Sequence, residues 1–230
     1  MMHHSGNSHF SGKRRLVLHA LGAASVMVAL GIAAPVAHAG SYDDFFKALQ
    51  LDLPREVQSL LRRGFDVNSI DPQRRDPALV YAVRYEAVKC LPVLLAAPGI
   101  NIEARAANGD SALMVAAYKG DKISASALLD KGAEPNRPGW TALHYAAASG
   151  SRDIVRMLLE KSAYIDAASP NNTTPLMMAA GGGWYGVVEL LIAEGADQSL
   201  KNDVGMTTRD FAAKFADVKQ PASQAMPLGN

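Results

Sequence analysis

The sequence predicts an all-α solenoid of helix-turn-helix units that are joined by short β-hairpin-like loops. A turn followed by an apolar segment recurs at residues 108–120, 138–150 and 172–183, and a second apolar segment follows each copy. The leucine after the turn recurs at intervals of 34, 30 and 33 residues, at Leu79, Leu113, Leu143 and Leu176. A period of this length is typical of stacked supersecondary units, and differences of a few residues are tolerated where they fall in loops.

The two apolar segments of each copy predict two short helices with different packing roles. The first segment carries alanine pairs, which let neighbouring helices approach closely, and the second carries leucine pairs. Burying one such leucine is worth roughly 1.5–3 kcal/mol. A single helix pair cannot bury its apolar faces alone, so we expect the units to stack around a shared core. Gly64, Gly132 and Gly195 suit the left-handed position after the second helix, where Ser162 should weaken the cap.

Two motifs of one central unit resemble the ankyrin repeat. Residues Thr141 to Ala147 (TALHYAA) resemble its turn and first helix, and Asp153 to Leu159 (DIVRMLL) resemble its second helix. The resemblance covers residues 40–218 as about five to six units. It implies a non-catalytic scaffold that binds another protein through its loop tips and concave face, without a cofactor.

Both ends of the repeat region carry degenerate copies. Residues 42–63 are interpreted as an opening helix pair, and residues 205–215 as an incomplete final copy in which Arg209 replaces the turn leucine. Terminal units are expected to be atypical because one of their faces meets water. We expect residues 219–230, which contain two prolines, to form a disordered tail.

The first 39 residues show the three regions of a secretory signal peptide. A basic cluster at 13–15 precedes an apolar run at 16–34, and small residues before Gly40 predict cleavage after Ala39. An uncleaved membrane anchor is the alternative, and the arginine pair leaves the twin-arginine export route open. We therefore expect a bacterial periplasmic or secreted protein, or a membrane-anchored one with its repeats outside the cytoplasm.

Composition and charge argue against several classes of protein. The 230 residues are 49% hydrophobic and 20% charged, as in an ordinary globular chain, and the net charge of +1 argues against a nucleic-acid binder. Without the leader, the chain keeps one cysteine, Cys90, and one histidine, His144. A Cys-His or multi-His site cannot be built from one such chain. We expect a monomer with no metal, no cofactor and no catalytic residues, and an enzyme built on the repeat scaffold is the alternative.

Partner contacts are assigned by register with the family, to loop tips and to the exposed ends of first helices. The expected positions are Arg74, Arg75, Asp76, Arg84, Tyr85, Asn108, Asp110, Tyr118, Lys119, Trp140, Thr173, Trp184, Tyr185, Met206, Lys214 and Phe215. Arginine, tyrosine and tryptophan are enriched in binding hot spots. The favoured contact surface is therefore the early cluster, which consists of Arg74, Arg75, Arg84, Tyr85, Tyr118 and Lys119. The alternative is a solvated face with its aromatic rings packed on neighbouring loops, and for Trp140 we expect packing.

Three further features allow a structural and a functional interpretation. Cys90 is interpreted as a buried inert thiol, with an exposed redox sensor as the alternative. The run Gly181–Gly183 indicates either a flat close-approach patch or sequence drift. Asn171 and Asn172 begin overlapping N-x-T glycosylation sequences. The resemblance also implies that the ring nitrogens of His144 fix neighbouring backbone, and Thr141 and Thr174 can cap the helices that follow them.

Overall fold

The computed structural model describes residues 39–219, and this range contains eleven α-helices and no strand. Two isolated antiparallel bridges, Ile70 with Pro77 and Arg105 with Ser111, lie in the loops before the second and third units. The expected all-α solenoid with hairpin-like loops is therefore confirmed. None of the helices within the described range is long and apolar enough to cross a membrane.

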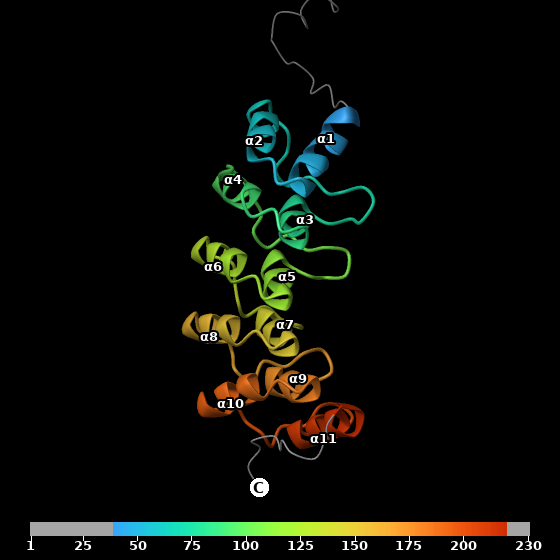
Figure 1. The fold of residues 1–230 in the computed structure, drawn as a ribbon, viewed down its shortest axis with the longest axis vertical. Coiled ribbons are helices and arrows are strands. Elements are labelled where there is room, and N and C mark those ends of the chain that lie inside the picture. The colour runs from blue at the N-terminus through green and yellow to red at the C-terminus, as the bar shows by residue number, and fades with distance from the viewer. Residues whose placement is uncertain (1–38, 220–230) are drawn as a thin grey trace, which may run out of the picture. The chain divides into compact units, whose positions relative to one another are not determined.

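The helices form five consecutive pairs and one final single helix (Figure 1). The pairs are α1 (Ala39–Gln50) with α2 (Pro54–Arg62), α3 (Ala78–Arg84) with α4 (Cys90–Ala96), α5 (Ala112–Lys119) with α6 (Lys122–Asp130), α7 (Ala142–Ser149) with α8 (Arg152–Glu160), and α9 (Pro175–Gly182) with α10 (Tyr185–Ala193). The last helix is α11 (Thr208–Lys219). Each pair is one unit of the stack, and the units are numbered first to fifth in this order.

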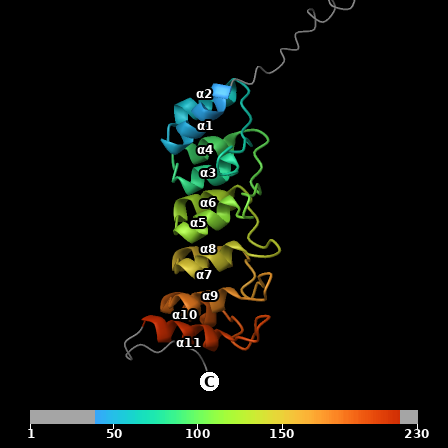
Figure 2. The same ribbon diagram turned by 90° about the vertical axis from the view of Figure 1, so that its right-hand side faces the viewer.

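The first helices of successive units contact one another from α1 through α11, and the second helices form a parallel row from α2 through α10. The loops that connect one unit to the next lie along one side of the two rows (Figure 2). The first helices are therefore flanked by second helices on one side and by loops on the other. The exposed C-terminal ends of the first helices form a surface that we call the first-helix face, and in the second and third units it contains Arg84, Tyr85, Tyr118 and Lys119.

The predicted alanines and leucines form a continuous core between the units. The alanine pairs at 116–117, 146–147 and 179–180 are fully buried, as are Leu128 and Leu158 of the second helices. Small side chains on the first helices let consecutive helices approach closely, and the leucines fill the space between the two rows. The stacked core that the repeat predicts is confirmed.

The ends of the second helices follow the predicted glycine pattern. Gly64, Gly132 and Gly195 adopt left-handed backbone angles with φ between +90° and +99°. Ser162 occupies the equivalent place after α8 with φ +61°. A non-glycine residue in this region costs roughly 1–2 kcal/mol, which agrees with the predicted weaker cap.

Hydrogen bonds between consecutive loops tie each unit to the next. Asn68 Oδ1 accepts the backbone N–H of Asn101 at 2.8 Å, and Asn136 Oδ1 accepts that of Tyr164 at 2.7 Å. Carboxylates do the same elsewhere, in the pairs Glu103 with Glu134 and Asp166 with Asp197. These bonds satisfy backbone donors that have no partner in a strand or helix. The loops are therefore stacked as regularly as the helices.

Several expectations about the chain ends fall at the limits of the described residues. Residues 1–38 of the expected leader lie outside the described residues, and Ala39 and Gly40 form the start of α1. The expected tail lies outside them from residue 220, while Lys219 is the last residue of α11. The final copy contributes α11 alone, which packs on α9 and covers the end of the first-helix row.

Candidate partner-binding surface

A row of aromatic rings supports an arginine on the first-helix face of the second unit. The ring of Phe46 meets that of Tyr81 edge-on at 5.0 Å between centroids, and Tyr81 stacks on Tyr85 at 4.3 Å. The Arg74 guanidinium carbon lies 5.6 Å from the centre of the Tyr85 ring, within cation–π range. Burial and the neighbouring Tyr85 raise the pKa of Tyr81 to about 12, so its ring stays neutral at physiological pH. The outer ring and Arg74 are therefore held on a packed base.

Arg84 is held beside this row by a buried carboxylate. Its Nε donates to Asp76 Oδ2 at 2.7 Å, and its Nη2 lies 3.5 Å from Asp76 Oδ1. The Arg84 side chain remains 30% exposed while Asp76 is almost completely buried. A guanidinium carries five N–H donors, so the pair leaves donors of Arg84 at the surface. Asp76 thus positions Arg84 instead of contacting a partner itself.

The third unit continues the face with Tyr118 and Lys119 at the end of α5. Tyr118 is 61% exposed, and its ring meets Tyr145 edge-on at 6.3 Å between centroids. Lys119 Nζ lies 2.8 Å from Glu86 Oε1, in an exposed ion pair between units. The Tyr145 hydroxyl donates to the buried Asp110. Burial is the main cause, and this hydrogen bond the second, that raises the pKa of Tyr145 well above its ordinary value. This neutral contact holds Tyr145 beneath Tyr118.

The expected structural role of His144 is confirmed. His144 is fully buried, and burial lowers the pKa of its imidazole, so the ring is neutral. Its Nε2 lies 2.9 Å from the Thr173 carbonyl oxygen, which can only accept, so Nε2 carries the proton. Its Nδ1 accepts the Thr141 backbone N–H at 3.2 Å and lies 2.9 Å from the Thr141 hydroxyl. The expected cap by Thr174 is also present, since its hydroxyl accepts the Met177 backbone N–H.

The first-helix face of the fourth and fifth units is filled by packing. Trp184 Nε1 donates to the Ala148 carbonyl oxygen at 2.7 Å, and its ring lies against Gly150 and Gly182. Gly181 lies in the same way against the ring of Phe211 from α11. The glycine run therefore makes room for two aromatic rings, in agreement with the close-approach interpretation, although the sequence did not identify the rings. Trp184 remains 42% exposed, so packing and partner contact are compatible at this position.

The structure corrects several expected contact positions. Asp76, Asp110 and Thr173 were expected at exposed loop tips, but all three are buried. Asp76 and Asp110 lie directly before their first helices, where they accept hydrogen bonds from Arg84 and Tyr145, and the Thr173 carbonyl binds His144. The short distance from these positions to the helix start places their side chains inward.

The other expected positions differ in exposure. Arg74, Arg75, Asn108, Tyr118, Lys119 and Lys214 are exposed. Arg84, Tyr85, Trp140, Tyr185 and Met206 are half-buried, and the side chain of Phe215 lies outside the described residues. Trp140 meets His144 edge-on at 5.2 Å, in agreement with the expected packing role. The structure therefore gathers the early cluster on one face and separates it from Trp184 and Tyr185 at the start of α10.

The redox interpretation of Cys90 is wrong. Cys90 is the first residue of α4 and is fully buried, and burial raises the pKa of its thiol to about 12. A redox sensor needs an accessible thiolate. A buried thiol with so high a pKa is neither accessible nor ionised at physiological pH. The glycosylation motifs are placed in a loop where Asn171 and Asn172 are exposed, with Asn172 Nδ2 donating to Asp203 Oδ1 at 2.6 Å.

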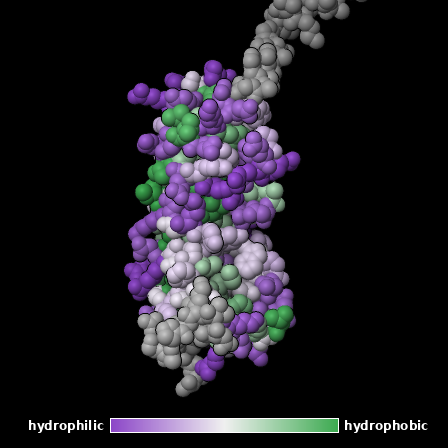
Figure 3. Space-filling view, turned by 45° about the vertical axis from the view of Figure 1, so that its right-hand side comes forward, coloured by the Kyte–Doolittle hydropathy of each residue, from purple (hydrophilic) through white to green (hydrophobic). Residues whose placement is uncertain are grey.

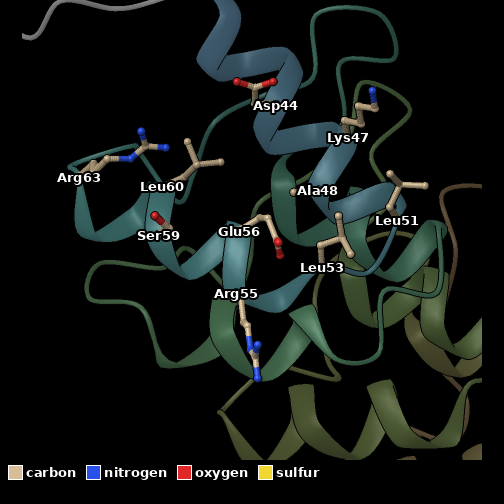
Figure 4. A pocket seen from close by; sticks show the side chains of 10 residues that line it. All are labelled: Asp44, Lys47, Ala48, Leu51, Leu53, Arg55, Glu56, Ser59, Leu60 and Arg63. Atoms are coloured by element: carbon tan, nitrogen blue, oxygen red, sulfur yellow. The ribbon is translucent and has the colours of Figure 1, made fainter.

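A groove between α1 and α2 lies outside every sequence expectation. It has a volume of about 470 Å³ and combines apolar side chains, among them Leu51 and Leu53, with both signs of charge (Figure 4). Leu51 is 57% exposed, which the pattern of apolar residues alone does not show, so the sequence carried no signal for this groove. Within residues 42–214 no group of three or more His, Cys, Asp or Glu side chains is placed to hold a metal ion.

Sequence reasoning also missed the rings that support the early cluster. Tyr81 and Tyr145 both lie two residues after the turn leucine of their units, on the side of the first helix that faces the preceding unit. This shared position relative to the turn leucine was a signal that sequence reasoning could have used to find them. The strongly hydrophilic residues gather over the N-terminal units of this face, and paler residues follow toward the C-terminal units (Figure 3).

Comparison with known proteins also indicates ankyrin repeats. Residues 79–169 match the model of three ankyrin repeats, and residues 171–203 match that of a single ankyrin repeat. The chain is 40% identical over 93 residues to human neurogenic locus notch homolog protein 4, covering 39% of this chain and 5% of that protein. It is 29% identical over 157 residues to the mouse B-cell lymphoma 3 protein homolog, covering 65% of this chain and 35% of that protein.

A solved structure agrees with the architecture. The crystal structure of the ankyrin repeat domain of Bcl-3, described as a unique member of the IkappaB protein family, superimposes with a TM-score of 0.66 at 28% identity. The match covers 74% of this chain and 80% of that one. The repeat motifs, the stacked helix pairs and both family models agree, and the chain belongs to the ankyrin-repeat family.

Proposed function

We propose that this protein is an exported, non-catalytic scaffold that binds another envelope or secreted protein through its first-helix face and loop tips. Ankyrin repeats are protein-interaction modules, and the chain carries them over most of its described length. The observation that supports this surface best is the early cluster, where Arg74, Arg84, Tyr85 and Tyr118 lie at the surface on supporting contacts. A rigid surface loses little conformational entropy on binding.

Export is supported by the sequence of the first 39 residues. A basic cluster, an apolar run and small residues before Gly40 follow the order of a cleaved leader. N-terminal sequencing of the protein purified from cell fractions tests this part of the proposal. An N-terminus at Gly40 in the exported fraction supports cleavage. An intact Met1 in the membrane fraction supports the tethered alternative, in which the repeats stay outside the cytoplasm.

Affinity purification from the envelope fraction tests the binding role. Arg84 and Tyr85 changed together to Ala should lose a protein that the wild type captures. Arg84→Ala leaves the buried Asp76 carboxylate without its ion pair, so a loss of stability must be separated from a loss of contact. Tyr118→Ala supplies that separation because its ring is exposed. An identical set of captured proteins for all variants contradicts the proposed surface.

A further inference from the structure

Around the early cluster, arginine side chains lie at the surface while three carboxylates are buried. Arg74 and Arg75 are exposed, and no carboxylate of residues 42–214 forms an ion pair with either. Three carboxylates of the same face are buried and already occupied. Asp71 accepts the Arg74 backbone N–H at 2.6 Å, Asp76 accepts Arg84, and Asp110 accepts Tyr145.

The buried carboxylates already accept hydrogen bonds from the chain, so they are not available to bind a partner. Within the early cluster, Glu86 provides an exposed carboxylate, and it is paired with Lys119. The whole chain is nearly neutral, with a net charge of +1, so the arginines are a local feature of this face. A small basic patch on a neutral chain fits a short acidic segment better than the extended phosphate backbone of a nucleic acid.

The arginines are also held in place before any partner arrives. The Arg74 guanidinium rests on the Tyr85 ring, and Asp76 fixes Arg84 from beneath. A planar guanidinium fits a carboxylate through two parallel hydrogen bonds, and pre-positioning reduces the entropy lost on binding. Tyr118 offers a large exposed ring further along the face.

We propose that the early cluster binds an acidic peptide segment of the partner protein. Arg74 and Arg84 hold its carboxylates, while Tyr85 and Tyr118 contact the side chains between them. This inference rests on the proposed function and specifies the chemistry of the partner at that site. Charge complementarity selects the occupant, since Arg74 and Arg75 form no ion pair with a carboxylate of residues 42–214 and Arg84 keeps N–H donors at the surface beside its bond to Asp76.

Fluorescence anisotropy with the full chain tests this inference. The probes are a labelled peptide of alternating Glu and Tyr, its Gln–Tyr and Lys–Tyr analogues, and a single-stranded oligonucleotide. We expect the Glu–Tyr peptide to bind about tenfold more tightly than the Gln–Tyr peptide at low salt, with the difference reduced at high salt. The Lys–Tyr peptide should bind most weakly because it meets like charges.

Arg74→Glu should weaken binding of the Glu–Tyr peptide by about tenfold or more. Arg156→Glu is the matched control, because Arg156 is exposed on the outer helix α8 and the charge change is the same. This control should leave the affinity within about twofold of the wild type, because Arg156 lies on α8 of the fourth unit, outside the early cluster. Both side chains are exposed, so neither variant should impair folding.

Each contrary outcome rejects a different statement. Equal binding of the Glu and Gln peptides, or equal losses in both variants, overturns the acidic assignment. Tighter binding of the oligonucleotide with the same dependence on Arg74 overturns the choice of a peptide. If the Gln–Tyr peptide binds as tightly as the Glu–Tyr peptide and Tyr118→Ala abolishes the binding of both, the scaffold function stands while this inference fails. If no peptide binds and no captured protein depends on this face, both proposals fail.

Discussion

The second and third units differ from the fourth and fifth in how they use the same positions of the first helix. Five residues after the turn leucine, the early units carry Arg84 and Tyr118, and the later units carry Ala148 and Gly181. The early side chains reach the surface, while the Phe211 ring lies against Gly181 and the Trp184 ring packs against Gly150 and Gly182. One core therefore supports two kinds of face, since positions outside the core are free to vary.

The largest expected effect tests whether the core is equally important in both halves. Leu128→Ala in the third unit and Leu158→Ala in the fourth should each cost about 2–5 kcal/mol, because both leucines are fully buried and leave a cavity. Urea denaturation followed by circular dichroism measures the loss. A change within measurement error for either variant contradicts its place in the core.

The next effect tests the packed face of the later units. Gly150→Ala should cost roughly 1–2 kcal/mol from its left-handed backbone, with about 1–3 kcal/mol more from the clash with the Trp184 ring. Gly132→Ala is the matched control, because it shares the left-handed backbone but has open space around it. Equal losses in thermal denaturation of the two variants would show that the Trp184 ring does not constrain Gly150.

A smaller effect depends on pH and on one buried residue of the fourth unit, His144. Burial lowers the pKa of His144 below its ordinary 6.5, so the unfolded chain binds a proton that the folded chain rejects. Stability is therefore full above pH 6.5 and falls as the pH is lowered from there toward the folded pKa. The free energy of unfolding should show this slope in wild type, and His144→Gln should remove it. His144 is the only histidine of residues 39–219, so persistence of the slope refutes this origin.

The smallest stability effect belongs to the early face. Arg74→Ala and Tyr118→Ala should change the free energy of unfolding by less than about 0.5 kcal/mol, because both side chains are exposed. Equilibrium unfolding with the wild type as reference measures this. A loss comparable with that of Gly150→Ala would mean that the early face is structural like the later one.

The stacked core could be predicted from the sequence because its signals are local. The alanine and leucine pairs recur with the period of one unit, and a buried thiol was the default for Cys90. The glycines after the second helices could be assigned because the left-handed backbone at that position favours glycine. Even the contacts of His144 follow from a motif that contains its first partner, Thr141.

The side-chain contacts on the first-helix face could not be predicted as fully, because they depend on neighbours in other units. Trp184 meets a carbonyl 36 residues away, and Asp110 meets a tyrosine 35 residues away. Register alone placed Asp76 at an exposed tip, although its nearness to the start of α3 turns the carboxylate inward. Periodicity determines which side of a helix is buried, but it does not determine which ring of the next unit occupies a gap.

The hydrogen bonds between loops make the stack tolerant of changes in repeat length. The donor follows its acceptor by 33 residues at Asn68 and by 28 at Asn136, yet the bonds measure 2.8 and 2.7 Å. A flexible side chain spans the interval, so a loop can lose residues without breaking the link to its neighbour. The same kind of link therefore joins units of unequal length, with separations from 28 to 33 residues along the chain.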